Sequence, residues 1–274
     1  MPYFVTEDNA QLYYELNGKG PAVVLIHGWN CNRHHFDKQL GFLRERYQVL
    51  SYDLRGHGAS ERTNYGLASP QFAKDLNDII EFCELKDVVV VGWSMGASVI
   101  FEYVRQYGCQ NLSKICIIDM TPKMTTDDEW KLGAYGGYNA DAILNDISTM
   151  AKSWDAMLEF SVDGFFGKKG YEEQKDNYDW AFKESKRNTP YLMINMCLAF
   201  IRNDYREEIK QISIPTLIAY GGASKMYAPE VSKYMNDCIP KSILMEFEDC
   251  GHALHIEEPE RFNTALDDFI KNNV

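Results

Sequence analysis

The sequence predicts an α/β protein with a mostly parallel, doubly wound sheet, because short apolar runs alternate with amphipathic segments along most of the chain. The runs at residues 22–26, 87–93 and 115–118 are almost entirely apolar, which is typical of strands covered on both faces. The alternation stops between residues 123 and 210, where no strand pattern is visible. We therefore expect a sheet core interrupted by a helical insertion after the sixth strand.

Six strands are expected before the insertion. Residues 3–17 predict a hairpin that turns at Glu7-Asp8-Asn9, and residues of about 32–46 form a polar amphipathic segment. The pair Ser69-Pro70 predicts a helix N-terminus, since serine caps the first amides and proline fits the first helical position. Another helix is expected over residues 95–107. The expected strands are the two of the hairpin and then 22–26, 47–54, 87–93 and 115–118.

The insertion is predicted to consist of several helices that are rich in aromatic side chains. These aromatic residues either pack as ordinary core or line an apolar pocket. For a pocket, we expect contributions from Trp130, Phe165 and Phe166 of the insertion and from Trp93 of the core. The expected helix starts in the insertion are Thr126, Asn139, Ser153 and Thr189-Pro190.

The α/β pattern resumes after the insertion. Two further strands are expected at residues 214–222 and 242–249, with a helix between them and a last helix that begins near Pro259. The expected domain organisation is therefore a core made of residues 1–122 and 211–274, with residues 123–210 as the helical insertion.

Composition and charge exclude several classes of function. The formal net charge is −12, and nucleic acids and anionic membrane surfaces both require positive patches, so we expect neither as a partner. The first residues lack the pattern of a signal peptide, and the seven cysteines show no CxxC or Cys/His pairing. We expect a cytoplasmic protein with reduced thiols, without a metal or another cofactor, present as a monomer or homodimer.

Ser94 is the candidate nucleophile. It is the serine of a Gly92-x-Ser94-x-Gly96 pattern, which is weak alone but here stands where an apolar strand runs directly into a helix. So tight a turn imposes strained backbone angles on the serine and accepts only small residues on either side. The turn would lift the hydroxyl above the sheet and place it at a helix N-terminus, where developing negative charge is favoured.

The backbone amides of Trp29 and Met95 are the candidate oxyanion donors. Gly28 allows a sharp bend that can turn the Trp29 amide toward Ser94, and the Met95 amide follows the serine directly. Two such donors form the hole that stabilises a tetrahedral oxyanion, often the largest single contribution to acyl transfer.

His252 is the candidate general base. It follows Gly251 directly after the last expected strand, and this loop leaves the imidazole free to face the serine. We expect His255 to lie at the approach to the last helix and not to act as the base. His27 and His57 are expected to brace their own loops. Asp53 and Arg55, in the same turn as His57, are interpreted as a local pair.

These ordered motifs resemble those of the α/β-hydrolase family. The resemblance is carried by a strand followed by HGW, then DxRGxGxS, GWSMG, the helical insertion and GHxxHxExPxxF, and it covers nearly the whole chain. Within the family, the motifs most resemble those of the capped serine esterases and of the cofactor-free, haloperoxidase-like perhydrolases. The resemblance implies Ser94 as nucleophile, His252 as base, the Trp29 and Met95 amides as oxyanion hole, and residues 123–210 as the cap.

The third member of the triad departs from the common pattern of that family. Most members carry it as Gly-x-x-Asp after the strand that follows the cap, but here Gly221 is followed at that spacing by Ser224 and then Lys225. Neither side chain can hold the imidazole in its correct tautomer as a carboxylate does.

Asp119 is the best remaining candidate for the acid. It ends the strand at residues 115–118, and catalytic groups in open α/β sheets gather at the carboxyl ends of strands. A minority of the family resembles this arrangement. Glu230 should already lie on a helix, and Asp249 stands only three residues before His252. Asp119 as a plain turn residue, or another carboxylate as the acid, stay open as alternatives.

The resulting expectation is a carboxylic ester hydrolase with small to medium ester substrates, acting through an acyl-enzyme on Ser94. A serine at this position excludes the alkyl-enzyme chemistry of the dehalogenase and epoxide-hydrolase branches, which need an aspartate there. Two alternatives remain. The same triad could use peroxide instead of water, which gives perhydrolase or haloperoxidase-like activity, or the protein could bind a ligand without turnover.

Overall fold

Eight strands form one sheet in the order β1-β2-β4-β3-β5-β6-β7-β8 in the computed structural model, which describes residues 3–169 and 171–272. β1 pairs antiparallel with β2 and β2 with β4, whereas the neighbouring pairs from β4 to β8 are all parallel. The predicted α/β fold with a mostly parallel sheet is thus confirmed. The strands are β1 (Tyr3–Val5), β2 (Gln11–Asn17), β3 (Ala22–Ile26), β4 (Gln48–Tyr52), β5 (Val88–Trp93), β6 (Leu112–Ile118), β7 (Thr216–Gly221) and β8 (Ser242–Phe247).

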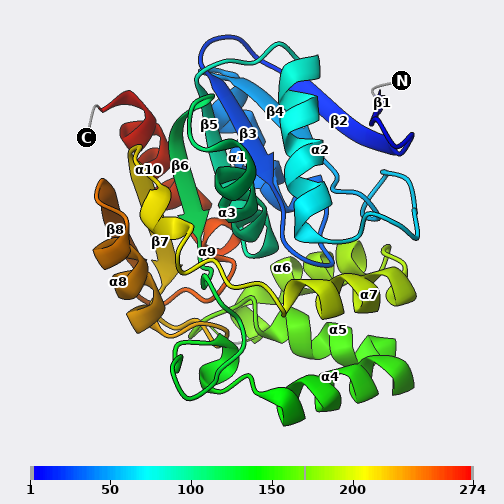
Figure 1. Ribbon diagram of the computed structural model, residues 1–274. Helices are drawn as coiled ribbons and strands as arrows, with labels where there is room; N and C mark the ends of the chain where they lie inside the picture. Colours follow the sequence, from blue (N-terminus) through cyan, green and yellow to red (C-terminus); the bar gives the residue numbers. More distant parts are fainter. Residues whose placement is uncertain (1–2, 170, 273–274) are drawn as a thin grey trace.

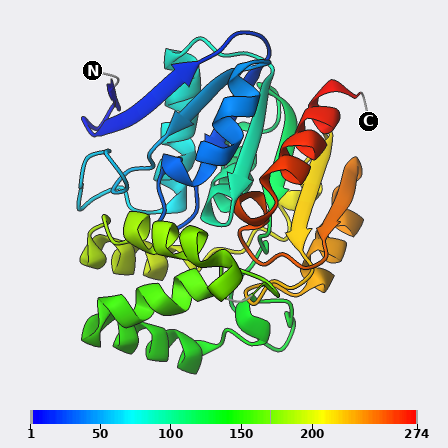
Figure 2. The same ribbon diagram turned by 180° about the vertical axis from the view of Figure 1, so that it is seen from behind.

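Helices cover both faces of this sheet (Figures 1 and 2). Alternate residues of β5 enter separate cores: Val88 and Val90 pack with α2, α3 and α8, and Val89 and Val91 pack with α1 and α10. None of the helices within the described residues is long and apolar enough to cross a bilayer. The helices of the core are α1 (Asp37–Arg44), α2 (Ser69–Phe82), α3 (Met95–Tyr107), α8 (Pro229–Cys238), α9 (Leu254–Glu257) and α10 (Pro259–Lys271), with a short 3₁₀ helix at Arg33–Phe36. Two further 3₁₀ helices, Ala134–Gly136 and Ile209–Gln211, lie within and at the end of the segment between β6 and β7.

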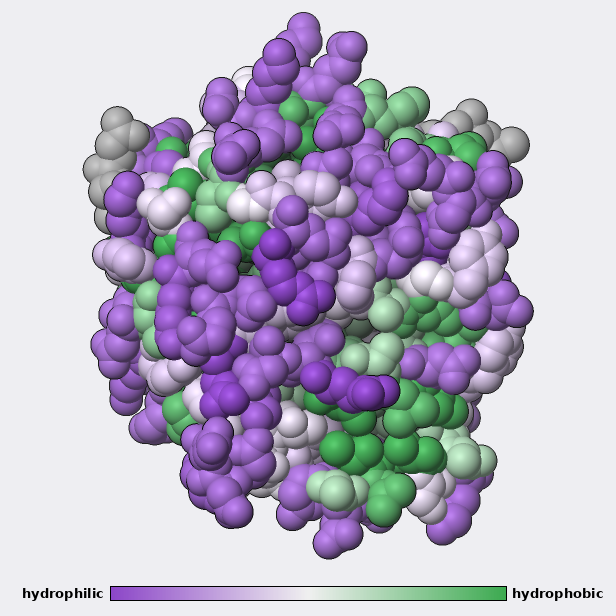
Figure 3. Space-filling model, viewed as in Figure 1, coloured by the Kyte–Doolittle hydropathy of each residue, from purple (hydrophilic) through white to green (hydrophobic). Residues whose placement is uncertain are grey.

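Four helices lie between β6 and β7 in the chain, and in Figure 1 they lie beyond the carboxyl ends of the parallel strands. Figure 3 shows hydrophobic side chains gathered on the outer surface over these inserted helices, whereas most of the remaining face is hydrophilic. The inserted helices are α4 (Ala140–Lys152), α5 (Trp154–Asp163), α6 (Tyr171–Ser185) and α7 (Pro190–Phe200).

Three of the four predicted helix starts in the insertion are confirmed. Asn139 and Ser153 cap α4 and α5 with their side chains, and Thr189 directly precedes α7. The predicted start at Thr126 is wrong. The Asp127 carboxylate accepts the Glu129 and Trp130 amides at 2.9 Å each and closes a local turn, which competes with helix formation.

Candidate active site

Ser94 lies in the turn between β5 and α3. β5 ends at Trp93 and α3 begins at Met95, so this single residue connects a strand to a helix. Its backbone angles are φ 54° and ψ −123°, a conformation that residues with a side chain rarely adopt. Such strain persists only where the surroundings over-determine it, and it is common at functional sites.

The glycines on either side of Ser94 are required by close backbone approaches. A Cβ atom on Gly92 would come within 2.6 Å of the Ala97 nitrogen, and one on Gly96 would come within 2.1 Å of the Ile26 carbonyl oxygen. The Gly-x-Ser-x-Gly pattern is therefore a steric requirement of this turn.

We expect Gly96→Ala to destabilise the fold by about 1–3 kcal/mol, the usual cost of forcing an extra group into a packed site. The new methyl group would push β3 away from the start of α3, because its neighbour is the backbone oxygen of Ile26. Gly41→Ala is the matched control, since nothing lies within 4 Å of a Cβ there and Gly41 is inside α1. The control should be neutral or slightly more stable in urea unfolding, and equal stability of both variants would contradict the steric argument.

His252 and Asp119 form a buried pair. His252 Nδ1 lies 2.7 Å from Asp119 Oδ2, and their side chains are only 1% and 2% exposed. A carboxylate can only accept, so Nδ1 carries the proton and Nε2 keeps a free lone pair. The Nε2 atom is thereby in the form that a general base requires.

The sheet register brings Asp119 beside Ser94. Trp93 of β5 pairs with Ile118 of β6, so the two residues that follow them leave adjacent strands at the same end of the sheet. The Ser94 amide donates to the Ile118 oxygen at 3.1 Å, and the Asp119 amide donates to the Ala219 oxygen at 2.9 Å. Asp119 has a positive φ of 41°, which turns its side chain away from the strand direction.

The loop that carries His252 is held from several sides. The Trp93 indole donates to the His252 oxygen at 2.9 Å, and the two rings lie 5.4 Å apart. The Gly251 amide donates to Glu257 Oε1 at 2.6 Å. Among the described residues, Ser94 Oγ has no hydrogen bond to His252, which is common before a substrate draws the two groups together.

Ser224 is a further partner of Asp119 that sequence reasoning missed. Its hydroxyl lies 2.8 Å from Asp119 Oδ2, the same oxygen that meets His252. Ser224 Oγ also accepts the Met226 and Tyr227 amides at 3.3 Å each, so its own proton is free to be donated to the carboxylate. The signal was its place three residues after Gly221, where the common pattern has an aspartate and this chain has a hydroxyl that contacts Asp119.

The alternative carboxylates point elsewhere. Asp249 is exposed and pairs with Lys168 at 2.7 Å, and Glu230 on α8 lies 3.6 Å from Lys233. Neither has His252 as a partner in these contacts.

The other histidines occupy structural positions. His255 is packed against Phe36, Trp93 and Phe262, and burial lowers its pKa well below the ordinary value. His27 Nε2 accepts the Leu54 amide at 3.0 Å. Each of these rings therefore supports local packing or backbone geometry.

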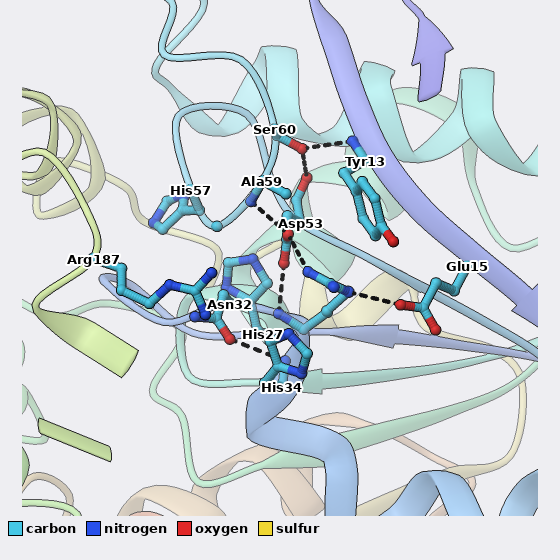
Figure 4. A network of polar contacts seen from close by, with 12 residues as sticks. Tyr13, Glu15, His27, Asn32, His34, Asp53, His57, Ala59, Ser60 and Arg187 are labelled. Atoms are coloured by element: carbon cyan, nitrogen blue, oxygen red, sulfur yellow. Dashed lines mark hydrogen bonds and ion pairs between the residues drawn. The ribbon is translucent and has the colours of Figure 1, made fainter. Parts of the chain in front are cut away.

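Asp53 and Arg55 do not pair with each other, so that interpretation is wrong. Asp53 binds the Arg33 guanidinium at 2.8 Å and accepts the Arg33 and Ala59 amides at 2.7 Å each, within the network of Figure 4. Arg55 instead binds Asp75 at 2.8 Å and Asp8 at 2.6 Å. The two side chains leave the turn toward different elements, and each finds its partner there.

A pocket opens beside Ser94. Trp29, Met226 and Tyr227 of the core line it together with Ser94. The insertion contributes the rest of its wall, partly from its helices and partly from Met124, Tyr135 and Tyr138, which precede α4. The volume of this pocket that water-sized molecules can occupy is about 60 Å³, which suits a small substituent of a substrate. The contributing residues of α4, α5 and α7 are Asp146, Met150, Met157, Ser161, Cys197 and Phe200.

The expectation for the pocket aromatics requires correction, because Trp93, Trp130, Phe165 and Phe166 are not among the residues that line this pocket. Trp93 and Phe165 pack on each other with their ring centres 5.0 Å apart, and both rings contact the ring of His252. They belong to the core on the side of the sheet that α1 and α10 cover. Phe166 packs in the same core. Trp130 packs edge-to-face against Tyr234, and its indole donates to the Lys123 oxygen. These four are core residues.

The backbone around Trp29 and Met95 borders the serine. A Cβ atom on Gly28 would lie 3.1 Å from the Ser94 Cβ, so the Gly28-Trp29 segment passes directly beside it. The amides of Trp29 and Met95 donate no hydrogen bond to other described residues. The Trp29 indole donates to the Met193 oxygen of α7 at 2.9 Å, which ties this segment to the inserted helices.

Comparison with known proteins identifies the family. Residues 23–265 match the alpha/beta hydrolase family. A non-heme chloroperoxidase of Kitasatospora aureofaciens is 27% identical over 98% of this chain and 99% of its own. A bifunctional esterase/perhydrolase of Acinetobacter calcoaceticus is 24% identical over 99% of this chain and its whole length. An esterase from Exiguobacterium antarcticum superposes with a TM-score of 0.92 at 27% identity, over 98% of this chain and 99% of that chain. The chain belongs to the alpha/beta hydrolase family.

Proposed function

We propose that this protein is a serine hydrolase that cleaves small to medium carboxylic esters through an acyl-enzyme. The observation that carries the proposal is the 2.7 Å contact between His252 Nδ1 and Asp119 Oδ2 beside the strained Ser94 turn. A buried carboxylate that fixes the imidazole tautomer next to a serine is the arrangement that activates a hydroxyl as nucleophile. No metal or other cofactor is needed for this chemistry.

The first half of the proposed reaction forms the acyl-enzyme. Ser94 Oγ attacks the ester carbonyl carbon while His252 Nε2 takes the hydroxyl proton, and the carbonyl electrons move onto oxygen. The Trp29 and Met95 amides donate to this oxyanion. Asp119 stabilises the imidazolium that forms. When the tetrahedral intermediate collapses, His252 returns the proton to the departing alcohol, and the acyl group stays on Ser94.

The second half releases the acid. Water enters, His252 takes one of its protons, and the resulting hydroxide attacks the acyl carbon. The second tetrahedral intermediate is stabilised by the same two amides, and Ser94 leaves with the proton from His252. Ester and water are thereby converted to carboxylic acid and alcohol with the enzyme unchanged.

Residues 123–210 are proposed to act as a cap over this site. The inserted helices supply much of the pocket wall, and three hydrogen bonds on Asn188 and Trp29 help to tie the insertion to the core. Asn188 donates to the Cys31 oxygen at 3.1 Å and accepts the Gly58 amide at 3.0 Å, and Trp29 binds Met193. A cover of this kind excludes water and strengthens the electrostatic contacts of the reaction.

A second candidate function is perhydrolysis on the same residues. It is favoured by two relatives of this chain, a non-heme chloroperoxidase and a bifunctional esterase/perhydrolase. In this reaction hydrogen peroxide replaces water in the second half, so the acyl-enzyme is released as a peracid.

One experiment separates these proposals. A fluorophosphonate should label Ser94 stoichiometrically, and the protein should hydrolyse a short nitrophenyl ester. Peracid formation is then measured with the same ester in the presence of peroxide. Absence of both labelling and hydrolysis in the folded protein would favour a ligand-binding role without turnover.

We expect Ser224→Ala to lower kcat/KM by about tenfold, the size of one lost hydrogen bond to a charged group, because Asp119 loses a donor that holds its Oδ2 in position beside His252 Nδ1. The change leaves more negative charge on Asp119 Oδ2, because a 2.8 Å donor is removed. The imidazolium is then stabilised, so the acidic limb of the kcat/KM profile should move toward higher pH. Ser224→Thr keeps the hydroxyl and should restore both values. A lower rate with an unmoved pH profile would indicate that Ser224 only supports its turn.

A further inference from the structure

The pocket beside Ser94 contains one acidic side chain in an otherwise uncharged wall. Asp146 of α4 is the only Asp, Glu, Lys or Arg among the described residues that line it. The remaining wall consists of methionine, aromatic, serine and cysteine side chains. A charge that enters such a partly desolvated space interacts with a carboxylate far more strongly than it would in water.

Asp146 retains unused capacity to accept hydrogen bonds. Its Oδ2 accepts the Tyr138 hydroxyl at 2.8 Å, and this is its one hydrogen bond to the residues that the structure describes. No lysine or arginine of the described chain forms an ion pair with it. A carboxylate offers about four acceptor sites, so a ligand's donor can bind to the others.

Two tyrosines stand beside this carboxylate. Tyr135 and Tyr138 both line the pocket, and their ring centres lie 5.9 Å apart. The Tyr138 hydroxyl donates its proton to Asp146, which leaves its oxygen as an acceptor and its ring for contact with a ligand. Aromatic faces attract cations through their quadrupole, and together with a carboxylate they favour an ammonium group.

We propose that the pocket selects esters whose non-reacting end carries an ammonium group, and that Asp146 determines this selection. The assignment rests on the proposed function, in which the ester carbonyl lies at Ser94. Since Ser94 and Asp146 line the same pocket, the far end of an ester bound at Ser94 can face Asp146. A terminal carboxylate would instead meet Asp146 without a compensating cation, which is strongly unfavourable.

Three methyl esters that differ only at the far end of the acyl chain test the assignment. They are methyl 6-aminohexanoate, methyl hexanoate and monomethyl adipate, and hydrolysis is followed by acid release. Burial raises the pKa of the Asp146 carboxyl above its ordinary value, so the assay is run at mildly alkaline pH, which favours the ionised form. We expect kcat/KM for the ammonium ester to exceed that for the carboxylate ester by at least about 100-fold, given one attractive and one repulsive contact at low effective dielectric.

Asp146→Asn should lower that ratio at least about tenfold, because the amide keeps an acceptor for Tyr138 but removes the charge. Methyl hexanoate, which has no charge at its far end, serves as the reference ester, and the other two rates are divided by its rate in the same variant. Asp141→Asn is the matched control. Asp141 lies in the first turn of the same helix, is exposed and is not part of the pocket wall, so this variant removes an equal charge without altering the pocket.

The assignment is overturned if Asp146→Asn leaves the ammonium-to-carboxylate ratio unchanged, or if Asp141→Asn alters it equally. Hydrolysis of all three esters at similar rates by the wild type also overturns it, while the proposed function stands. Loss of fluorophosphonate labelling together with all ester hydrolysis is a different result. It overturns the proposed function and this assignment with it.

Discussion

Replacing Ser94 with alanine is expected to lower kcat for a short nitrophenyl ester by about 10⁵–10⁶-fold, the effect known for loss of a catalytic serine. Without the hydroxyl no acyl-enzyme can form, and His252 has no proton to take from the nucleophile. Residual turnover over the uncatalysed rate should remain, because oxyanion donors and binding act without the serine. The measurement is kcat together with fluorophosphonate labelling, which should disappear.

Ser161→Ala is the matched control for this variant. Ser161 is buried and lines the same pocket, so it is the other serine hydroxyl that a substrate could meet there. We expect its replacement to leave labelling intact and kcat within about tenfold, since it removes no more than one hydrogen bond. Retained labelling in Ser94→Ala and its loss in Ser161→Ala would contradict the assignment of the nucleophile.

A double variant tests whether Ser94 and His252 act as one unit. Residues of a triad are strongly non-additive, because removal of either one already abolishes nucleophilic attack. Ser94→Ala combined with His252→Ala should therefore be no slower than Ser94→Ala alone. A further large decrease in the double variant would show that His252 has a role independent of the serine.

The core of the fold could be predicted because its signals are local and repeated. Val88 to Val91 form a continuous apolar run, as expected for a strand that contributes side chains to the cores on both faces of a sheet. Helix starts such as Asn139 and Ser153 were visible because their side chains cap the helix themselves. Thr126 failed because the nearby Asp127 closes a turn of its own, a competition that periodicity does not reveal.

Residues of the candidate active site could be predicted where a tight turn or the end of a strand determines their position. Ser94 can be recognised by the glycines on either side of it, which the turn requires because the backbone passes so close to them. Asp119 and His252 follow strands that end at the same edge of the sheet. The pocket wall was not predictable, because it depends on how the inserted helices pack on the core. Trp93 is adjacent to Ser94 in sequence, yet its ring lies in the core against Phe165.

Ser224 and Asp146 were missed for a related reason. The role of Ser224 depends on a contact between β6 and the loop after β7, which are separated by the whole insertion. Asp146 appears in the sequence as one of many acidic residues on a helix, and only its contact with Tyr138 and the pocket distinguishes it. Long-range packing of this kind leaves little trace in one sequence.

Replacing Asp119 with asparagine is expected to lower kcat by about 10⁴-fold while the fold is kept. The asparagine amide has nearly the same shape, but its nitrogen can donate to His252 Nδ1 and stabilise the tautomer with the proton on Nε2. That tautomer cannot accept a proton from Ser94. Asp249→Asn is the control, because Asp249 is the exposed carboxylate close to His252 in sequence and pairs with Lys168. Its rate should match the wild type, and an Asp119→Asn rate within about tenfold of wild type would exclude Asp119 as the acid.

The position of Ser224 makes a stricter test of the same assignment possible. Ser224 Oγ lies 2.8 Å from Asp119 Oδ2, and that oxygen lies 2.7 Å from His252 Nδ1, so a carboxylate at position 224 would start close to the imidazole. Asp119→Asn combined with Ser224→Asp should therefore recover at least about tenfold of the lost rate, because a carboxylate again favours the productive tautomer. Ser224→Asp alone should not gain activity, since two carboxylates so close cannot both ionise without cost. If the combined variant is as slow as Asp119→Asn while its thermal unfolding is unchanged, the acid acts only from the end of β6, and the loop after β7 serves to hold it there.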